Sequence, residues 1–386
     1  MNFNLPEEIK EFQKAVHKFA KERMAPRAEA IDAKAEFSRE NWRDLSEMGL
    51  LGLPFPEEYG GTAASPLATT IAMESVARAG VDGGTTLAWG AHTILAGVPI
   101  WLLGSNRQKE RYLPKLANGE WIGGFGLTEP DSGSDAASLR TTAEKKGDRY
   151  ILNGSKMFIT NGAVGDLFVV FAATDKKKGN RGISAFIVER GFAGFSVGEE
   201  LNKMGNRTST TTPLYFDNCE VPEENLLGQE NMGFLSVGKE TLEWERSCMI
   251  APLVGGMEFV LEECTRYAKE RKQFGSSIAN FQAIQHKLAD IKVAIEASRL
   301  LIYRVACMKA RGQSAMMEAS IAKLFVTESA VRVANEAVQI FGGYGYIHDY
   351  PVERFYRDVK LGTLGAGTSE VQKMIIAAEM LKRKGF

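Results

Sequence analysis

The stretch YILNGSKMFITNG, residues 150–162, decides the fold class, because it has a strand pattern and the chain on either side of this region has a helical one. Its apolar and polar residues alternate with a period of two, which is typical of a half-buried β-strand. Clusters of Gly, Asn, Asp and Lys separate it from further strand-like runs, which are DLFVVFAAT (166–174), GISAFIVER (182–190) and PLYFDNCEV (213–221). We therefore predict a β domain over residues 118–230.

Helical patterning surrounds this β region on both sides. Before it, apolar residues recur at steps of three and four. After it the helices are long, and one apolar face is formed by Ile284, Leu288, Ile291 and Ile295. The sequence therefore predicts an α+β fold in three parts, which are an N-terminal α-helical domain (1–117), the middle β domain (118–230) and a C-terminal helical bundle domain (231–386).

The charge balance of the chain argues against a polyanionic partner. Among 386 residues, 47 are basic and 48 are acidic, the formal net charge is -1, and no long block carries one sign. We therefore expect no binding to nucleic acid. No run of eighteen apolar residues occurs, and the N-terminus lacks the basic start and apolar core of a signal peptide. We expect no membrane span and no signal peptide.

Cysteine and histidine spacing offers no metal site. The four cysteines lie far apart without a CxxC pair; they are Cys219, Cys248, Cys264 and Cys307. This usage predicts reduced, mostly buried thiols in a cytoplasmic protein. The four histidines are scattered, and no HExxH motif occurs. We therefore expect no bound metal.

Glycine- and hydroxyl-rich loops are the remaining candidates for chemistry. They are GLTEPDSGSD (126–135), FITNG (158–162), FGGYGY (341–346) and GAGTSE (365–370). Such loops present backbone N–H groups and small hydroxyls, which suit a polar planar ring or a pyrophosphate. Each loop taken alone is more often a plain turn than a site, and no dinucleotide fingerprint or P-loop accompanies them.

Taken together and in this order, the motifs resemble those of the acyl-CoA dehydrogenase family of flavoenzymes. The matching segments are LTEPDSGSD (127–135), YILNGSKMFITNG (150–162), RYAKERKQFGSSIANFQAIQ (266–285), QIFGGYGY (339–346) and YRDVKLGTLGAGTSEVQ (356–372). The resemblance covers essentially the whole chain. It implies a helical domain, a β domain and a four-helix bundle, assembly as a homotetramer (a dimer of dimers), and electron transfer to an electron-transfer flavoprotein.

The resemblance also implies bound FAD. Thr128 and Ser134 would lie along the isoalloxazine ring, Thr160 would reach its reactive edge, and Phe158 stands where many members have Trp. The full set of implied cofactor-binding residues is Phe125, Leu127, Thr128, Gly133, Ser134, Phe158, Thr160, Arg271, Gln273, Phe274, Gln339, Gly343, Thr368 and Glu370. Of these, the residues from Arg271 to Gly343 would bind the pyrophosphate and adenosine of FAD in a neighbouring subunit. An ordinary solvated charge is the competing interpretation of Arg271.

The family reaction needs a carboxylate base for the α-proton of an acyl-CoA thioester. Many members carry it directly before Gly-Thr in the last motif, but here that position is Ala366. A subset that includes the isovaleryl type carries a Glu directly before an Arg on an adjacent helix, which corresponds to Glu245. Glu243 and Glu370 remain rival bases. The backbone N–H of Ala366 is the expected oxyanion donor, and the implied substrate-binding residues are Ser134, Glu243, Arg246 and Gly367.

Three functional classes follow from these features. The first is an FAD-dependent acyl-CoA dehydrogenase that forms a 2-enoyl-CoA. The second is a relative that works as an acyl-CoA oxidase or an enoyl-CoA reductase. The third is a non-enzymatic binding paralogue that lost its base at Ala366, and Glu245 is the feature that argues against it. The sequence leaves the acyl group open among short branched, straight-chain and alicyclic acids.

Overall fold

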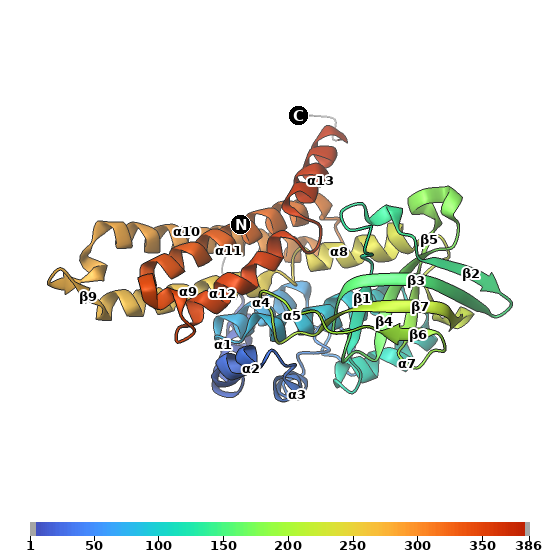
Figure 1. The fold of residues 1–386 in the computed structure, drawn as a ribbon, viewed down its shortest axis with the longest axis horizontal. Coiled ribbons are helices and arrows are strands. Elements are labelled where there is room, and N and C mark those ends of the chain that lie inside the picture. The colour runs from blue at the N-terminus through green and yellow to red at the C-terminus, as the bar shows by residue number, and fades with distance from the viewer. Residues whose placement is uncertain (1–4, 383–386) are drawn as a thin grey trace.

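The computed structural model describes residues 5–382. Helices, a β domain and a second set of helices follow one another along the chain, and Figure 1 shows the β domain at one end of the molecule and the long C-terminal helices reaching to the other end. The predicted α+β fold is therefore confirmed.

The N-terminal part is built from helices whose starts are capped by short polar side chains. The side chains of Ser38, Ser65, Asp82 and Ser105 each accept a hydrogen bond from the backbone N–H three residues later. The helices are α1 (Glu7–Arg23), α2 (Ala28–Lys34), α3 (Arg39–Glu47), α4 (Pro66–Arg78), α5 (Gly83–Gly90), α6 (Val98–Leu103) and α7 (Asn106–Ala117).

A π-helical segment, Ala91–Gly97, joins α5 to α6 in one continuous run. By length and composition alone, the run Gly83–Leu103 could cross a membrane, but 78% of its most apolar window is buried inside the protein. The segment packs against β1 (Gly123–Gly126) and against α8 (Lys239–Glu245). It is therefore a core element that links the N-terminal helices to both later parts of the chain.

The middle part is an eight-stranded mixed sheet with the order β6-β7-β3-β2-β4-β5-β8, and β1 pairs in parallel with β4. Every residue of β4 is buried, because one face packs on the main core and the other on a smaller core within the β domain. The remaining strands are β2 (Thr142–Lys146), β3 (Arg149–Thr160), β4 (Leu167–Ala173), β5 (Ile183–Glu189), β6 (Phe195–Val197), β7 (Thr211–Pro222) and β8 (Leu226–Leu227).

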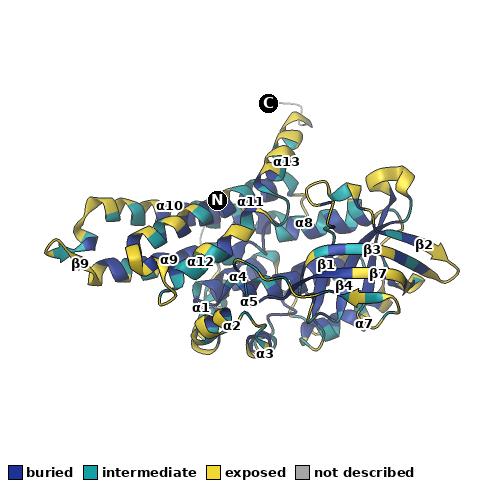
Figure 2. Ribbon diagram, viewed as in Figure 1, coloured by how far each residue is buried: buried dark blue, intermediate teal, exposed yellow. Residues whose placement is uncertain are grey.

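The C-terminal part is a bundle in which α9, α10 and α11 pack on one another and on α4. Ile291 and Ile295 of the predicted apolar face are fully buried, while the outer face of α10 is exposed (Figure 2). A short hairpin, β9 (Lys272–Gln273) and β10 (Ser276–Ser277), forms the far tip. The helices are α9 (Ala251–Glu270), α10 (Gln282–Ala310), α11 (Met316–Phe341), α12 (Pro351–Val359) and α13 (Ser369–Lys382).

One buried carboxylate joins all three parts of the chain. Asp358 of α12 accepts hydrogen bonds from the backbone N–H of Asn206 at 2.5 Å and of Gly83 at 3.2 Å. Burial raises the pKa of Asp358 to about 7, although the Asn206 N–H opposes this shift. The side chain therefore fixes the C-terminal bundle against the start of α5 and against the loop before β7.

We expect Asp358→Ala to destabilise the protein by about 2–4 kcal/mol, because two buried N–H groups lose their acceptor. Asp358→Asn keeps one acceptor oxygen and should cost less. The measurement is thermal unfolding of the variants beside Asp349→Ala, which removes an exposed carboxylate from the nearby loop. A wild-type melting curve for Asp358→Ala would contradict this role.

Candidate active site

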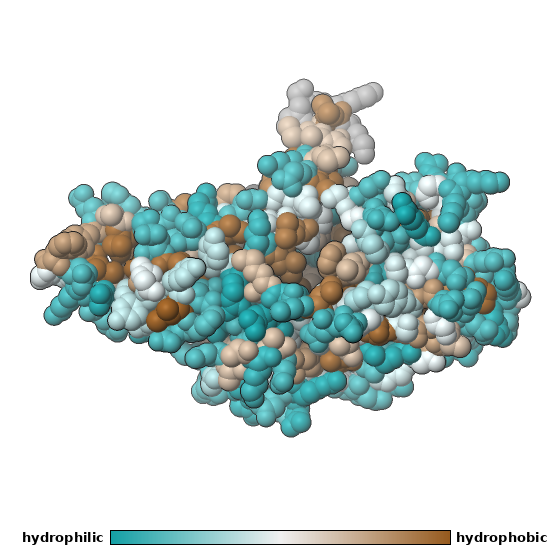
Figure 3. Space-filling view, in the orientation of Figure 1, coloured by the Kyte–Doolittle hydropathy of each residue, from teal (hydrophilic) through white to brown (hydrophobic). Residues whose placement is uncertain are grey.

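The predicted base lies where α8 ends. Glu245 is the last residue of α8, and the next residue, Arg246, caps the helix. The Arg246 side chain is buried, and its Nε donates a hydrogen bond to the carbonyl oxygen of Ala366 at 3.3 Å. The structure thus brings Arg246, the neighbour of Glu245, together with the GAGTSE segment, although 120 residues separate Arg246 from Ala366. Figure 3 shows a hollowed, partly hydrophobic area near the middle of the molecule, between the bundle and the β domain.

The turn before α13 is held from one side. Ala366 and Gly367 both have left-handed backbone angles, with φ of 56° and 83°. The amide of Gln372 donates to their carbonyl oxygens at 2.9 and 3.0 Å, and Lys323 Nζ donates to that of Gly367 at 2.8 Å. Because trans peptides point N–H opposite to C=O, the N–H groups of Gly367 and Thr368 face away from these donors. They are free to face an incoming anion.

The environment of Glu245 favours a proton acceptor that works near neutral pH. The residue is half-buried, and desolvation raises its pKa to about 7, while the positive charges of Arg246 and Lys323 act in the opposite direction. A carboxyl group that titrates near the working pH combines an ionised form with useful basicity. Glu245 therefore has the electrostatics that an α-proton base requires.

The two rival bases, Glu243 and Glu370, lie in surroundings that differ from those of Glu245. Glu243 is buried, and its oxygens accept from Lys309 Nζ at 3.0 Å, from Ser314 Oγ at 3.3 Å and from the Ala315 N–H at 3.4 Å. It anchors α8 to the loop between α10 and α11, so its carboxylate is already occupied. Glu370 is exposed at the start of α13, and hydrogen bonds from its own backbone N–H and from Thr368 lower its pKa.

The predicted flavin-side residues lie on β3, on the loop after β1 and, in the case of Phe125, on β1 itself. The Met157 N–H donates to the Thr128 carbonyl at 2.8 Å, which ties this loop to β3. The register of β3 shifts between Lys156 and Ile159, and Phe158 is 63% exposed with a φ of 62°. An exposed ring on a strained backbone is costly unless something packs on it. Thr160 is half-buried, and Gly133 and Ser134 are exposed.

Sequence reasoning missed the buried ion pair that braces this loop. Lys156 Nζ donates to Glu129 at 2.7 Å and to the Leu127 carbonyl at 3.2 Å. Glu129 also accepts from the backbone N–H groups of Arg140 and Thr141. Both charged side chains are almost fully buried. The available signal was a lysine at an inward-facing position of a predicted strand.

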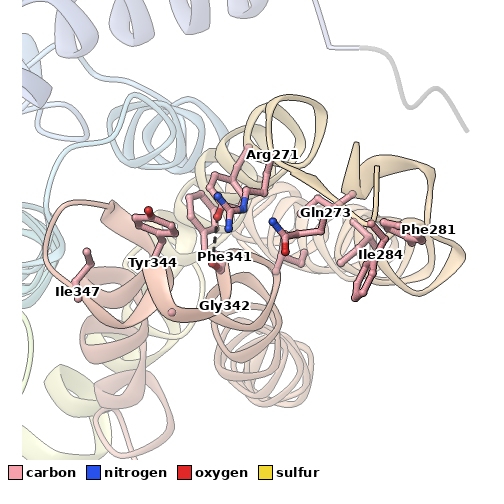
Figure 4. Close-up of a pocket in the computed structure, with 13 residues that line it drawn as sticks. Arg271, Gln273, Phe281, Ile284, Phe341, Gly342, Tyr344 and Ile347 are labelled. Atoms are coloured by element: carbon pink, nitrogen blue, oxygen red, sulfur yellow. Dashed lines mark hydrogen bonds between the residues drawn. The ribbon is translucent and has the colours of Figure 1, made fainter. Parts of the chain in front are cut away.

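The second group of predicted cofactor residues lies at the far tip of the bundle. Arg271 and Gln273 follow α9, and with Phe274, Tyr344 and Gly343 they line a groove of about 690 Å³. Figure 4 shows Arg271, Gln273, Tyr344 and Ile347 along this groove. The Arg271 guanidinium lies 5.6 Å from the centre of the Tyr344 ring.

A single chain does not bring the two groups of predicted residues together. Figure 1 places β9 at the tip of the bundle, away from the β domain and from α8. At this tip Phe274 is 95% exposed with a φ of 50°, so a strained backbone presents an apolar ring to the outside. Gln339 is also exposed, and a side chain added at Gly343 would meet nothing within 4 Å. The tip is therefore an open surface that carries aromatic side chains.

Trp89 of α5 and His92 of the following π-helical segment are core residues. Trp89 is fully buried, and its indole N–H donates to the Leu50 carbonyl at 3.1 Å. His92 is also fully buried: its Nδ1 accepts from the Gly123 N–H, and its Nε2 bonds the Leu116 carbonyl. Burial lowers the pKa of His92 to about 4, so it is neutral. Among residues 5–382, no group of three or more His, Cys, Asp or Glu side chains could hold a metal ion.

The four predicted thiols are free cysteines, and three of them are buried. This agrees with the usage expected from the sequence. Burial raises the pKa of Cys248 to about 11, so this thiol is protonated at neutral pH. Cys219, Cys248 and Cys264 are packing groups of the core, whereas Cys307 is half-buried.

Three family models together match most of the chain. The acyl-CoA dehydrogenase N-terminal domain matches residues 6–120, the middle domain matches 124–219, and the C-terminal domain matches 231–381. The chain therefore belongs to the acyl-CoA dehydrogenase family and is a flavoprotein oxidoreductase that uses FAD. The predicted family, fold, enzyme class and cofactor are confirmed.

Similar proteins extend over nearly the full chain. A short-chain-specific acyl-CoA dehydrogenase of Clostridium acetobutylicum is 44% identical and covers 99% of this chain and 100% of its own. The mitochondrial isovaleryl-CoA dehydrogenase of Oryza sativa is 43% identical over 97% of this chain and 91% of its own. The solved butyryl-CoA dehydrogenase of Megasphaera elsdenii has a TM-score of 0.95 at 42% identity, covering 99% and 100%.

A further solved structure concerns electron transfer. It was solved in connection with the electron transferring flavoprotein of Acidaminococcus fermentans and flavin-based electron bifurcation. The matched chain is 44% identical, has a TM-score of 0.96, and covers 99% of this chain and 100% of its own.

The pKa of Glu245 predicts how stability depends on pH. Its folded-state pKa of about 7 exceeds the ordinary 4.5, so the folded protein retains a proton that the unfolded chain loses in this interval. Stability from this group is therefore present at low pH and is lost as pH rises towards 7. Glu245→Gln has no such proton. Its stability relative to wild type should rise by on the order of 1–3 kcal/mol between about pH 5 and pH 8, as measured by thermal unfolding. A constant difference would contradict the raised pKa.

Proposed function

We propose that the protein dehydrogenates an acyl-CoA to the 2-enoyl-CoA and that Glu245 removes the α-proton. The observation that carries this proposal is a half-buried carboxylate with a pKa of about 7, placed beside a turn that holds Ala366 where many relatives carry the base. The rival carboxylate on α8, Glu243, is occupied by Lys309. Glu370 is exposed and has a lowered pKa, so it is a poorer base.

The turn would supply the donors for the thioester oxygen. Negative charge grows on this oxygen as the α-proton leaves, and prearranged N–H groups stabilise it. The expected donor is the Ala366 N–H, and the geometry favours the neighbouring Gly367 N–H as well, because the Ala366 carbonyl is held on the opposite side by Arg246 and Gln372. No side chain is needed at position 366 for this role.

The residues present fit FAD on observations made above. FAD, when bound, accepts the β-hydride at its N5. Thr128, Ser134 and Thr160 would hold the flavin ring system. The Phe158 ring would cover one face of the flavin, because this phenyl ring is exposed in the single chain. Thr368 and the start of α13 would present N–H groups to the pyrophosphate.

A second copy of the chain would complete the cofactor site. The tip residues Arg271, Gln273 and Phe274 lie far from β3 in one chain, yet they form an open aromatic groove with one guanidinium. This groove suits an adenine ring and a phosphate. We therefore propose a homotetramer, a dimer of dimers, in which each tip binds the FAD of a neighbour.

The partner and substrate proposals rest on the named relatives. Short-chain, butyryl and isovaleryl specificities among them point to a short straight or branched acyl group. The 44% identical chain that was solved in connection with an electron transferring flavoprotein supports such a flavoprotein as the electron acceptor.

We propose that the enzyme is cytoplasmic and that its domains meet near residues 117 and 230. Flavin bleaching across a panel of acyl-CoAs, with enoyl-CoA reduction assayed in parallel, separates dehydrogenase from reductase and ranks the acyl groups.

Glu245→Gln should abolish most substrate-dependent flavin reduction. The amide keeps the shape of the side chain but cannot accept the proton, so the rate should fall by roughly 10²–10⁴. FAD content and product binding should barely change. Stopped-flow bleaching with a short-chain acyl-CoA measures the rate, and Glu240→Gln, on the same helix, is the matched control. Reduction at the wild-type rate would move the base elsewhere.

A carboxylate supplied from the turn should recover part of the loss. We expect the double variant Glu245→Gly with Ala366→Glu to bleach faster than Glu245→Gly alone. Recovery should be incomplete, because a misplacement near 1 Å can cost about 10²-fold. Equal rates for the two variants would mean that a carboxylate at position 366 does not reach the α-carbon.

Arg271→Ala should lose FAD and, with it, assembly stability, because a ligand bound only to the folded assembly stabilises it by mass action. Lys272→Ala, the exposed neighbouring cation, is the control. The readouts are the flavin-to-protein absorbance ratio and the mass in solution by light scattering. A fully flavinated, stable Arg271→Ala assembly would count against the shared site.

A further inference from the structure

One buried cation beside the candidate site has no role in the mechanism above. Lys323 lies on the inner face of α11 and is 1% exposed. Its ammonium donates to the Gly367 carbonyl at 2.8 Å. A buried ammonium is costly unless a charge or several dipoles offset the lost hydration. A single neutral carbonyl offsets little of that cost.

The surroundings of Lys323 identify the compensating charge. Glu245 on α8 acts on it most strongly among the neighbouring charges, and Arg246 on the same helix opposes that effect. Glu328 on α11 and Glu370 on α13 contribute less. Glu328 also accepts from Ser369 Oγ, and Glu370 is exposed. Burial lowers the pKa of Lys323 to about 8, so it is largely protonated at neutral pH.

Holding the turn does not by itself require a lysine. The Gln372 amide already donates to the carbonyls of both Ala366 and Gly367, and Arg246 donates to the first. A neutral donor at position 323 would bond Gly367 equally well at a lower desolvation cost. What only a cation adds here is a positive charge on α11 that acts on Glu245.

We propose that Lys323 is a positioning residue for proton abstraction, which holds the Gly367 carbonyl so that the turn faces the thioester and keeps Glu245 ionised at neutral pH. The inference rests on the proposed role of Glu245 as base. The two cations have separate roles, because Arg246 fixes the end of α8 to Ala366 and Lys323 balances the carboxylate from α11.

Lys323→Met tests the charge, because methionine fills a similar volume without it. Removing a nearby positive charge disfavours the ionised carboxylate. The midpoint of the pH profile for flavin reduction should therefore rise by at least about 1 pH unit. The rate near pH 7 should fall by about five- to tenfold, and the difference from wild type should narrow towards pH 9. The KM for acyl-CoA should change less than kcat.

Further variants separate charge from packing. Lys323→Gln keeps a donor for Gly367 without the charge, so its midpoint should move as that of Lys323→Met does. Lys323→Arg restores the charge and should return the midpoint to the wild-type value. Lys309→Met, which removes a half-buried cation from Glu240 and Glu243 rather than from Glu245, should lower the melting temperature without moving the midpoint. FAD content is measured for each variant first.

The outcomes are distinct. Wild-type midpoints in both neutral variants would overturn the proposal, and so would a shifted midpoint in Lys323→Arg. If both neutral variants lose FAD or the fold while Lys323→Arg does not, Lys323 serves the fold alone and the proposal fails. The assignment of Glu245 as the base is tested separately. If Glu245→Gln still reduces its flavin at the wild-type rate, the proposed function of Glu245 is wrong. If Glu245→Gln is inactive but the Lys323 variants keep the wild-type pH midpoint, only the inference about Lys323 is wrong.

Discussion

The candidate site depends on the hydrogen bonds that side chains donate to two neighbouring backbone carbonyl groups. Arg246, Lys323 and Gln372 come from three helices and converge on the carbonyl oxygens of Ala366 and Gly367. A left-handed alanine costs roughly 1–2 kcal/mol, so the turn persists because these donors over-determine it. The same contacts set α8 against α11 and α13, and with them the position of Glu245.

Hydrogen bonds from buried polar side chains also fix the larger parts of the molecule. Asp358 joins the bundle to α5 and to the loop before β7. Asn161, at the end of β3, donates to the Ala88 and Gly123 carbonyls and so fastens the β domain to the N-terminal core. Such networks in a low dielectric are directional, whereas apolar packing alone tolerates sliding. They explain how loops from separate parts meet in register.

The sequence predicted the elements whose period is clear and missed those without one. The four long strands were predicted from strand-like runs between turn residues, although β4 and β5 are buried along nearly their whole length and do not alternate. The first strand, Gly123–Gly126, was missed because three of its four residues are glycine, and Thr142–Lys146 because its exposed positions resemble a polar turn. The hairpin Lys272–Ser277 has strands of two residues, too short for any pattern.

The site was predictable only in part for a related reason. Glu245 and Ala366 were found through the family motifs, but charged helix residues such as Lys323 resemble solvated ones until the packing is known. The pairing of Lys156 with Glu129 likewise depends on a loop that returns to β3. A sequence pattern indicates which face of a helix or strand a residue occupies, but it does not indicate which charged side chain packs against that face.

The distance between the bundle tip and α8 has a genetic consequence. Under the proposed sharing, each cofactor is held by residues of two copies, so damage at Arg271 acts in trans and damage at Glu245 acts in cis. Two chains that are each defective at one of these positions can then form mixed assemblies in which some sites contain no defect. The position of the exposed β9–β10 hairpin would therefore allow two alleles that are each inactive alone to give partial activity together.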